Sequence, residues 1–256
     1  MAHADTNVPA ALRGLGMRVA PDALAAFFAH ATKSRLSPLQ TVEQLIALER
    51  KEREVRNLAQ RTRLATLGKF KPLDQFDWNH PRKINRALFE QLLDCDYVEQ
   101  GANVLLRGPS GVGKSTLAQN LGFFALQKGH RVRYTTLAQA LADLGKYDSL
   151  PAFERRLRSY TKPALLLIDE LGYLPADARG GDILYNIISR RHQLRPTVIT
   201  TNLAFKQWGT IFPGAASVVA LVDRFVQHCH VLDIEGESWR QKEPATPSIK
   251  SRKPKR

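Results

Sequence analysis

The feature that most constrains the fold is a glycine-rich loop between two regular segments. Residues 108–115 read Gly-Pro-Ser-Gly-Val-Gly-Lys-Ser, which fits the phosphate-binding pattern G-x-x-x-x-G-K-[ST]. A strand-like apolar run at 104–106 precedes the loop, and a helix-like run at 116–128 follows it. The glycines let consecutive N–H groups converge on an anion, Lys114 supplies a cation for the outer phosphates, and Ser115 offers a hydroxyl to Mg²⁺. We therefore expect a nucleotide site lined by Gly108, Pro109, Ser110, Gly111, Val112, Gly113, Lys114, Ser115 and Thr116.

Short apolar runs alternate with helical segments from residue 82 to residue 234. The runs predict strands at 103–106, 131–135, 164–168, 197–201 and 230–234. Helices are predicted at 82–94, 116–128, 137–144, 152–159, 182–192 and 218–228. Continuously apolar strands separated by helices indicate a parallel sheet that helices cover on both faces. The predicted fold is a three-layer α/β domain of the P-loop NTPase type.

The first seventy residues predict a separate helical domain. Apolar residues recur at helical spacing in 21–34, and Ser37, Pro38 and Gln40 form a helix start with a capping box. The helix that begins there should run to about Leu67, where Gly68 can end it. We expect a helical domain at 1–70, an ATPase domain at 71–242 and a basic, disordered tail at 243–256. The aromatic connector 71–81 either packs on a nucleotide base or clamps onto the next domain.

The charge balance points to a polyanionic partner. The chain carries 38 Lys and Arg against 24 Asp and Glu, a formal net charge of +14. Such a surplus favours nucleic acid, although Glu49, Glu52 and Glu54 interleave the cations and would also suit a solvated helix face. The basic clusters are Arg50, Lys51, Arg53, Arg56, Arg61, Arg63, Lys69 and Lys71, and Lys250, Arg252, Lys253, Lys255 and Arg256. Two distant cysteines and the lack of a signal or membrane-spanning stretch predict a cytoplasmic protein.

Acidic and polar residues follow two of the predicted strands. Asp169 and Glu170 end the apolar run 164–168, at the sheet edge where the phosphate loop also lies. Asp169 is expected to hold Mg²⁺, and Glu170 to polarise the attacking water. Asn202 ends the next strand and could orient the same water. Arg224 could neutralise transition-state charge from a neighbouring subunit, or it could form a salt bridge with Asp223 or Asp233.

Several of these segments resemble the IstB-like ATPases, helper proteins of a bacterial insertion-sequence transposition system. The matching motifs are 169–175 (DELGYLP), 200–203 (TTNL), Trp208-Gly209, Asp223-Arg224 and 236–240 (GESWR). This family belongs to the AAA+ group, which also includes the DnaC helicase loader. The resemblance covers most of the chain to Lys242, but not the basic tail after Pro244.

The resemblance implies a function for the nucleotide site. It implies ATP and Mg²⁺ as ligands, and ATP-dependent homo-oligomers, a ring or a helical filament, that bind duplex DNA and assist a transposase. It also implies Asn202 as a sensor, Arg224 as a finger acting in trans and Arg240 as a second nucleotide-sensing arginine. A helicase loader is the rival hypothesis because loaders share these residues, and a small-molecule kinase is a third.

Overall fold

The computed structural model describes residues 7–173 and 176–239, so Arg240 and the predicted tail 243–256 lie outside the described residues. The chain divides into two compact units, Met1–Arg63 and Leu64–Arg256. The predicted boundary was residue 70. The division falls earlier because Ala65 and Leu67 are buried in the second unit.

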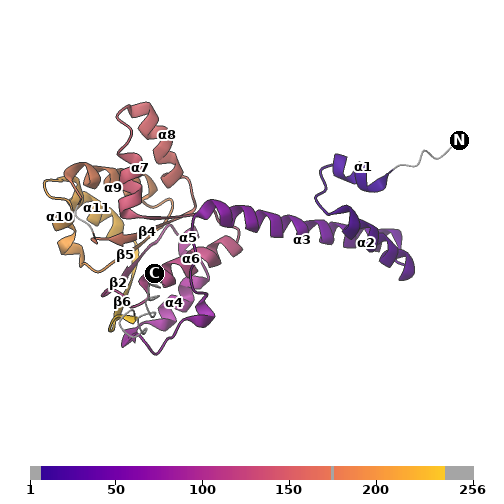
Figure 1. Cartoon of the computed structure of the whole chain (residues 1–256), viewed down its shortest axis with the longest axis horizontal. Helices are drawn as coiled ribbons and strands as arrows, with labels where there is room; N and C mark the ends of the chain where they lie inside the picture. Colours follow the sequence, from indigo (N-terminus) through magenta and orange to yellow (C-terminus); the bar gives the residue numbers. More distant parts are fainter. Residues whose placement is uncertain (1–6, 174–175, 240–256) are drawn as a thin grey trace, which may run out of the picture. The chain divides into compact units, whose positions relative to one another are not determined.

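The first unit is helical (Figure 1). It contains α1 (Val8–Gly14), which the sequence did not predict, α2 (Pro21–Lys33) and most of α3 (Pro38–Ala65). The capping box at the start of α3 is present: the Gln40 amide donates to Ser37 Oγ at 3.2 Å, and the Ser37 amide donates to Gln40 Oε1 at 2.9 Å. These two bonds satisfy backbone donors at the helix N-terminus, as the sequence predicted.

The second unit is built on a six-stranded sheet of order β1-β6-β2-β5-β4-β3. Its strands are β1 (Lys83–Ile84), β2 (Asn103–Arg107), β3 (Val132–Thr136), β4 (Leu165–Leu171), β5 (Thr197–Thr201) and β6 (Cys229–Glu235). Only β1 is antiparallel to its neighbour. The helix predicted from residue 82 was wrong at its start, because residues 83–84 pair with β6 and Asn85 caps a helix that begins at Arg86.

Helices cover both faces of this sheet (Figure 1), which confirms the predicted three-layer α/β architecture. One face carries α6 (Lys114–Gln127), with α4 (Arg86–Leu93) packed beside it. The other carries α7 (Leu137–Leu144), α9 (Ala178–Arg191) and α11 (Ser217–Val226), and α8 (Leu150–Thr161) packs on α7 and α9. The short elements are α5 (Asp96–Glu99), α10 (Trp208–Ile211), η1 (Leu73–Gln75) and η2 (Phe205–Gln207).

Side-chain alternation along the strands separates two parts of the core. Leu166, Ile168 and Ile199 are buried in the cluster with α7, α9 and α11. Leu167 points to the opposite face, where α6 approaches so closely that a Cβ at Gly122 would meet it at 2.7 Å. Strand residues two apart share a face, so Asp169 lies on the α6 face with Leu167. Within residues 7–173 and 176–239, no helix has both the length and the apolar character needed to cross a membrane.

Candidate nucleotide-binding site

The phosphate loop joins the C-terminal end of β2 to the first turn of α6. Gly111 and Gly113 have φ angles of +79° and +93°, in the left-handed region that favours glycine. A side chain at Gly111 would also collide with Ser238, and one at Gly113 with the ring of Phe76. The Trp239 amide donates to the Gly111 carbonyl at 2.9 Å. Segments distant in sequence therefore hold the loop in a shape that only glycines permit.

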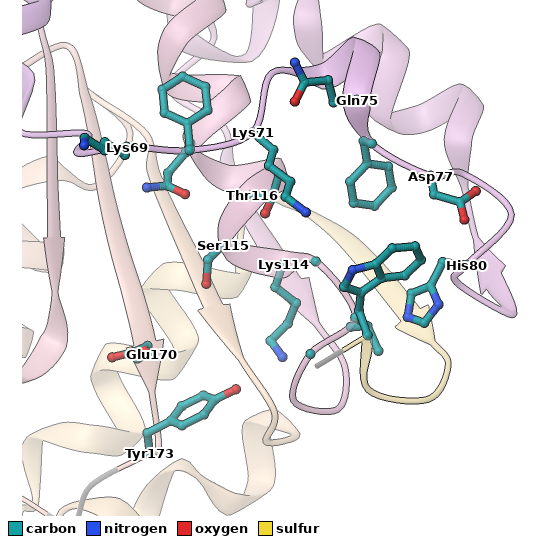
Figure 2. A pocket seen from close by; sticks show the side chains of 17 residues that line it. Lys69, Lys71, Gln75, Asp77, His80, Lys114, Ser115, Thr116, Glu170 and Tyr173 are labelled. Carbon is teal, nitrogen blue, oxygen red and sulfur yellow. The ribbon is translucent and has the colours of Figure 1, made fainter. Parts of the chain in front are cut away.

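Lys114 begins α6 and is folded back onto the loop. Its Nζ donates to the carbonyl oxygens of Gly108 at 2.7 Å and of Pro109 at 2.6 Å, and the residue is buried. Figure 2 shows the ammonium pointing toward Tyr173. An anionic ligand would offer this cation stronger, charge-assisted hydrogen bonds than neutral carbonyls can. The Lys114 ammonium can therefore exchange its hydrogen bonds to the loop carbonyls for hydrogen bonds to phosphate oxygens.

Asp169 is buried at the end of β4 and accepts three hydroxyl hydrogen bonds. Its Oδ1 accepts from Ser115 Oγ at 3.0 Å and from Thr200 Oγ1, and its Oδ2 accepts from Tyr134 OH at 2.6 Å. Burial and the hydrogen bond to Asp169 both raise the pKa of Tyr134, so this phenol stays a donor. Ser115 and Asp169, the two residues predicted as metal ligands, are thus joined by a direct hydrogen bond.

Glu170 occupies an irregular position at the end of β4. Its φ is +64°, rare for a residue with a side chain, and the register with β5 shifts between Ile168 and Leu171. The Glu170 amide donates to Thr200 Oγ1 at 3.0 Å, which holds the bulge. Such strain is retained where the surrounding structure fixes it, often at functional sites. The bulge leaves Glu170 exposed and lining the cavity beside the loop while Asp169 stays buried.

A cavity of about 410 Å³ lies against the phosphate loop. Residues 111–116 and Glu170 line it together with parts of the connector (Figure 2). The other lining residues are Lys69, Phe70, Lys71, Gln75, Phe76, Asp77, His80, Gln119, Tyr173 and Trp239. The cavity is thus cationic and carboxylate-bearing at the loop, with an aromatic wall built from the connector and the segment after β6.

The structure shows the connector packed onto the second unit, and it also places connector side chains at the cavity. Phe76 lines the cavity, whereas Trp78 packs between Phe76 and Phe89 of α4, with ring centroids 4.9 Å and 5.6 Å away. His80 also lines the cavity, and its ring lies 4.6 Å from that of Trp239. The connector is therefore packed against α4 and at the same time presents aromatic side chains to the cavity.

Asn202 and Arg224, two other predicted site residues, lie apart from the cavity in this structure. Asn202 is exposed at the end of β5 and does not line it. Arg224 packs from α11 onto α9, where it donates to Ser189 Oγ and stacks 4.9 Å from the Tyr185 ring centroid. The geometry thus brings Asp169 and Glu170 to the loop, and it leaves Asn202 and Arg224 outside.

Thr200 and Tyr134 are site residues that sequence reasoning missed. Both share the α6 face of the sheet with Asp169, since Leu167 is paired with Tyr134 on one side and with Val198 on the other. The sequence shows Thr200 as a polar residue in the run 200–202. The face of the sheet on which its side chain lies follows only from the register between β4 and β5. Lys69 and Lys71, which the sequence placed in a basic cluster, also line the cavity beside the phosphate loop.

Comparisons with known proteins agree with this geometry. The sequence model of the family described as IstB-like ATP binding protein matches residues 10–246. A protein of Pseudomonas aeruginosa, named as an ATP-binding protein of insertion sequence IS21, is 33% identical over 213 residues, covering 83% of this chain and 80% of that protein. A similarly named protein of insertion sequence IS232 from Bacillus thuringiensis is 34% identical over 208 residues, covering 80% and 83%.

Solved structures share the fold. The crystal structure of DnaI superposes with a TM-score of 0.52 at 17% identity, over 65% of this chain and 89% of that chain. The AMPPCP-bound DnaA from Aquifex aeolicus gives a TM-score of 0.52 at 23% identity, over 66% of this chain and 51% of that chain. These likenesses confirm the expected three-layer P-loop fold.

Proposed function

This chain belongs to the family of IstB-like ATP-binding proteins, and from that premise we propose that it hydrolyses ATP and that bound ATP controls its assembly on DNA. One observation carries the proposal. Lys114, Ser115 and Glu170 line a single cavity, and the Asp169 carboxylate accepts a hydrogen bond from Ser115. A cation, a hydroxyl and two carboxylates at a glycine-rich loop are the groups that phosphoryl transfer to water requires.

Each group has a distinct task in this proposal. Lys114 leaves the Gly108 and Pro109 carbonyls and binds the outer phosphates, and the amides of the loop bind the inner ones. Glu170 orients the attacking water and accepts its proton, which the exposed carboxylate at the bulge is free to do. Thr200 orients the Asp169 carboxylate and fixes the backbone of Glu170, since its hydroxyl donates to Asp169 and accepts from the Glu170 backbone amide.

The donor set at the loop fits Mg²⁺. This ion prefers oxygen ligands, and Ser115 Oγ and Asp169 Oδ1 are two oxygens 3.0 Å apart at the end of the sheet. These residues would hold the ion, which when bound neutralises charge on the outer phosphate oxygens. Thr200 and Tyr134 keep Asp169 oriented toward Ser115 by bonding its carboxylate from the other sides.

The aromatic wall supports a base subsite. Phe76, His80 and Trp239 line the end of the cavity formed by the connector and the segment after β6. Aromatic faces bind a purine by stacking, while the charged loop binds the phosphates. The cavity thus offers complementary surfaces to both halves of a purine nucleotide.

The nucleotide proposal is tested with two variants in the full chain. Lys114→Ala should abolish measurable ATP binding, because it removes the cation for the outer phosphates. Glu170→Gln should bind ATP normally but lower phosphate release at least about a hundredfold, since it loses only the proton acceptor. Binding is measured by calorimetric titration and turnover by phosphate release. Lys128→Ala, at the far end of α6, is the control and should change neither. Normal turnover by the Glu170 variant would refute its assigned role.

The proposed partners are duplex DNA and a transposase. The chain has a net charge of +14, and Arg50, Lys51, Arg56 and Arg63 are exposed along α3. The relatives at 33% and 34% identity are named for insertion sequences. A basic helix supplies phosphate contacts without sequence specificity, which suits a protein that helps a transposase at many targets.

Salt dependence tests the DNA assignment and its location. On duplex DNA, each phosphate contact contributes a slope of about −0.9 to the plot of log affinity against log salt concentration. Replacing Arg50, Lys51 and Arg56 with Gln should therefore flatten the slope by about 2.7. The control replaces two exposed cations of α8, Arg155 and Arg158, and the exposed Lys162 directly after it, and should leave the slope unchanged. A slope that changes with the second set of substitutions and not with the α3 set would place the DNA contact at α8. Tighter binding to single-stranded DNA than to duplex DNA would contradict the duplex assignment.

A further inference from the structure

Tyr173 has an unusual position between two cavities. It lines the nucleotide cavity and also a second hollow of about 290 Å³, lined by Leu137, Ala138, Leu141, Ala176 and Asp177. Glu170 is the other residue common to both. Together these two side chains form the wall that separates the nucleotide cavity from the hollow beside α7.

The turn after β4 fixes Tyr173 against the phosphate loop. Gly172 has a φ of +93°, and a side chain there would meet Leu203, so the turn is tightly defined. The Tyr173 amide donates to the Glu170 carbonyl at 3.3 Å. The strained Glu170 and the left-handed Gly172 therefore aim the Tyr173 side chain toward the loop.

The Tyr173 side chain meets the loop where an outer phosphate is expected. Its hydroxyl lies 2.9 Å from Ser110 Oγ. Its ring centroid lies 5.9 Å from Lys114 Nζ, and Figure 2 shows these two side chains near each other. In this loop pattern the lysine reaches the β- and γ-phosphates. Lys114 on one side and Glu170 on the other thus enclose the place of the terminal phosphate, and Tyr173 stands beside both.

We infer that Tyr173 is the residue that distinguishes a nucleoside triphosphate from a diphosphate, by donating its hydroxyl hydrogen bond to the terminal phosphate. Without nucleotide, the hydroxyl bonds Ser110, which keeps it satisfied and close to its target. A phenol that is already ordered loses little conformational freedom when it changes acceptor. The hollow beside α7 gives the ring room to adjust, because Tyr173 itself lines this space of about 290 Å³.

The inference rests on the proposed nucleotide site, and the experiment separates the two. The unsubstituted chain, Tyr173→Phe and Tyr147→Phe are each titrated with AMPPCP and with ADP in the presence of Mg²⁺. Tyr173→Phe keeps the ring and removes only the hydroxyl. Tyr147→Phe is the matched control, because it removes a phenol hydroxyl from a residue that lines neither cavity. Neither tyrosine is fully buried, so neither change should disturb the fold.

Tyr173→Phe should bind AMPPCP about tenfold more weakly and ADP with unchanged affinity, since one hydrogen bond to a charged phosphate is lost. Tyr147→Phe should bind both nucleotides as tightly as the unsubstituted chain does. An AMPPCP-to-ADP affinity ratio that Tyr173→Phe leaves unchanged would overturn the inference, as would an equal loss of AMPPCP affinity in Tyr147→Phe. Failure of the unsubstituted chain to bind either nucleotide would refute the nucleotide site itself.

Discussion

Asp169 shows how much of the site depends on single hydroxyl groups. Three of them, from Ser115, Thr200 and Tyr134, converge on one buried carboxylate. Hydrogen bonds to a charged group contribute about 1.5–3 kcal/mol each. The carboxylate is thereby held in one orientation before any ligand arrives, so the proposed Mg²⁺ site would need little reorganisation of Asp169.

Arg191 connects several elements of the second unit through hydrogen bonds from one side chain. It is 1% exposed, and its guanidinium donates to the carbonyls of Tyr160, Pro163 and Pro196 and to the hydroxyl of Thr197. These acceptors belong to the ends of α8, β4 and β5, where backbone groups lack partners within their own elements. A single buried cation thus replaces several missing backbone hydrogen bonds.

Arg191→Met should therefore destabilise the second unit by at least about 3 kcal/mol, because several buried carbonyls lose their donor at once. Arg190→Met is the matched control. Arg190 precedes Arg191 on α9 but pairs with Glu154 at the surface, so its loss should cost less than about 1 kcal/mol. Urea unfolding of the two variants measures both values. Equal destabilisation would contradict the anchoring role.

At the scale of elements, α3 is fastened to the loop before α2 by one acidic side chain. Glu49 is 8% exposed, and its carboxylate accepts from the Arg18 amide at 2.7 Å and the Val19 amide at 3.0 Å. Arg53, one turn later, pairs with Glu49 and also donates to the Gly16 carbonyl at 2.9 Å. The sequence suggests Glu49 as one of several solvated acids on a basic helix. In the structure its carboxylate is buried and accepts hydrogen bonds from the backbone.

The hydrogen bonds to the Glu49 carboxylate should make the stability of the helical unit sensitive to acid. Burial raises the pKa of Glu49, but hydrogen bonds from Arg53, Arg18 and Val19 outweigh burial and leave the pKa below its ordinary value. A carboxylate with a lowered pKa in the folded state contributes stability above its unfolded value of about 4.3, and that contribution is lost as pH falls through the lowered pKa.

Glu49→Gln should accordingly lower the melting temperature of the helical unit at pH 7, and the gap to the unsubstituted chain should narrow as the pH falls below about 4. Circular dichroism melts at several pH values test this. Glu54→Gln on the exposed part of α3 serves as the control, with no gap expected at either pH. A gap that persists in acid would show that volume or packing, rather than charge, explains the effect.

At the scale of the whole molecule, the position of Arg224 bears on assembly. The side chain contacts Ser189 and Tyr185 on α9 and does not line the nucleotide cavity. A finger that acted within its own chain would need to line that cavity. The placement therefore supports the proposal that hydrolysis requires a neighbouring copy, as in a ring or a helical filament, with Arg224 supplied in trans.

Mixing two inactive variants tests this arrangement. Arg224→Ala and Lys114→Ala should each hydrolyse ATP at least about a thousandfold more slowly, because one lacks the finger and the other the bound phosphates. In a mixture, some interfaces join an intact loop to an intact finger, and phosphate release should recover in part. The control mixes Lys114→Ala with Glu170→Gln, whose defects fall in the same half of the site. No recovery in the first mixture would refute action in trans.

Local patterns in the sequence were sufficient for much of the fold. The loop 108–115, the apolar strands and the capping box at Ser37 depend on residues close together in the chain, so their spacing alone predicted them. The start of α4 was mispredicted because residues 83–84 pair with β6, about 150 residues away. Strand pairing of this kind leaves little trace in the local pattern.

The sequence by itself thus determined the phosphate loop, the acidic strand end and the alternation that builds a three-layer sheet. Only the tertiary structure decided which side chains meet at that loop. Thr200 and Tyr134 reach Asp169 through the register of three strands, and Tyr173 reaches Ser110 through a bulge at Glu170. The physical reason is that hydrogen bonds between distant strands and turns depend on orientation, which only the packed sheet fixes.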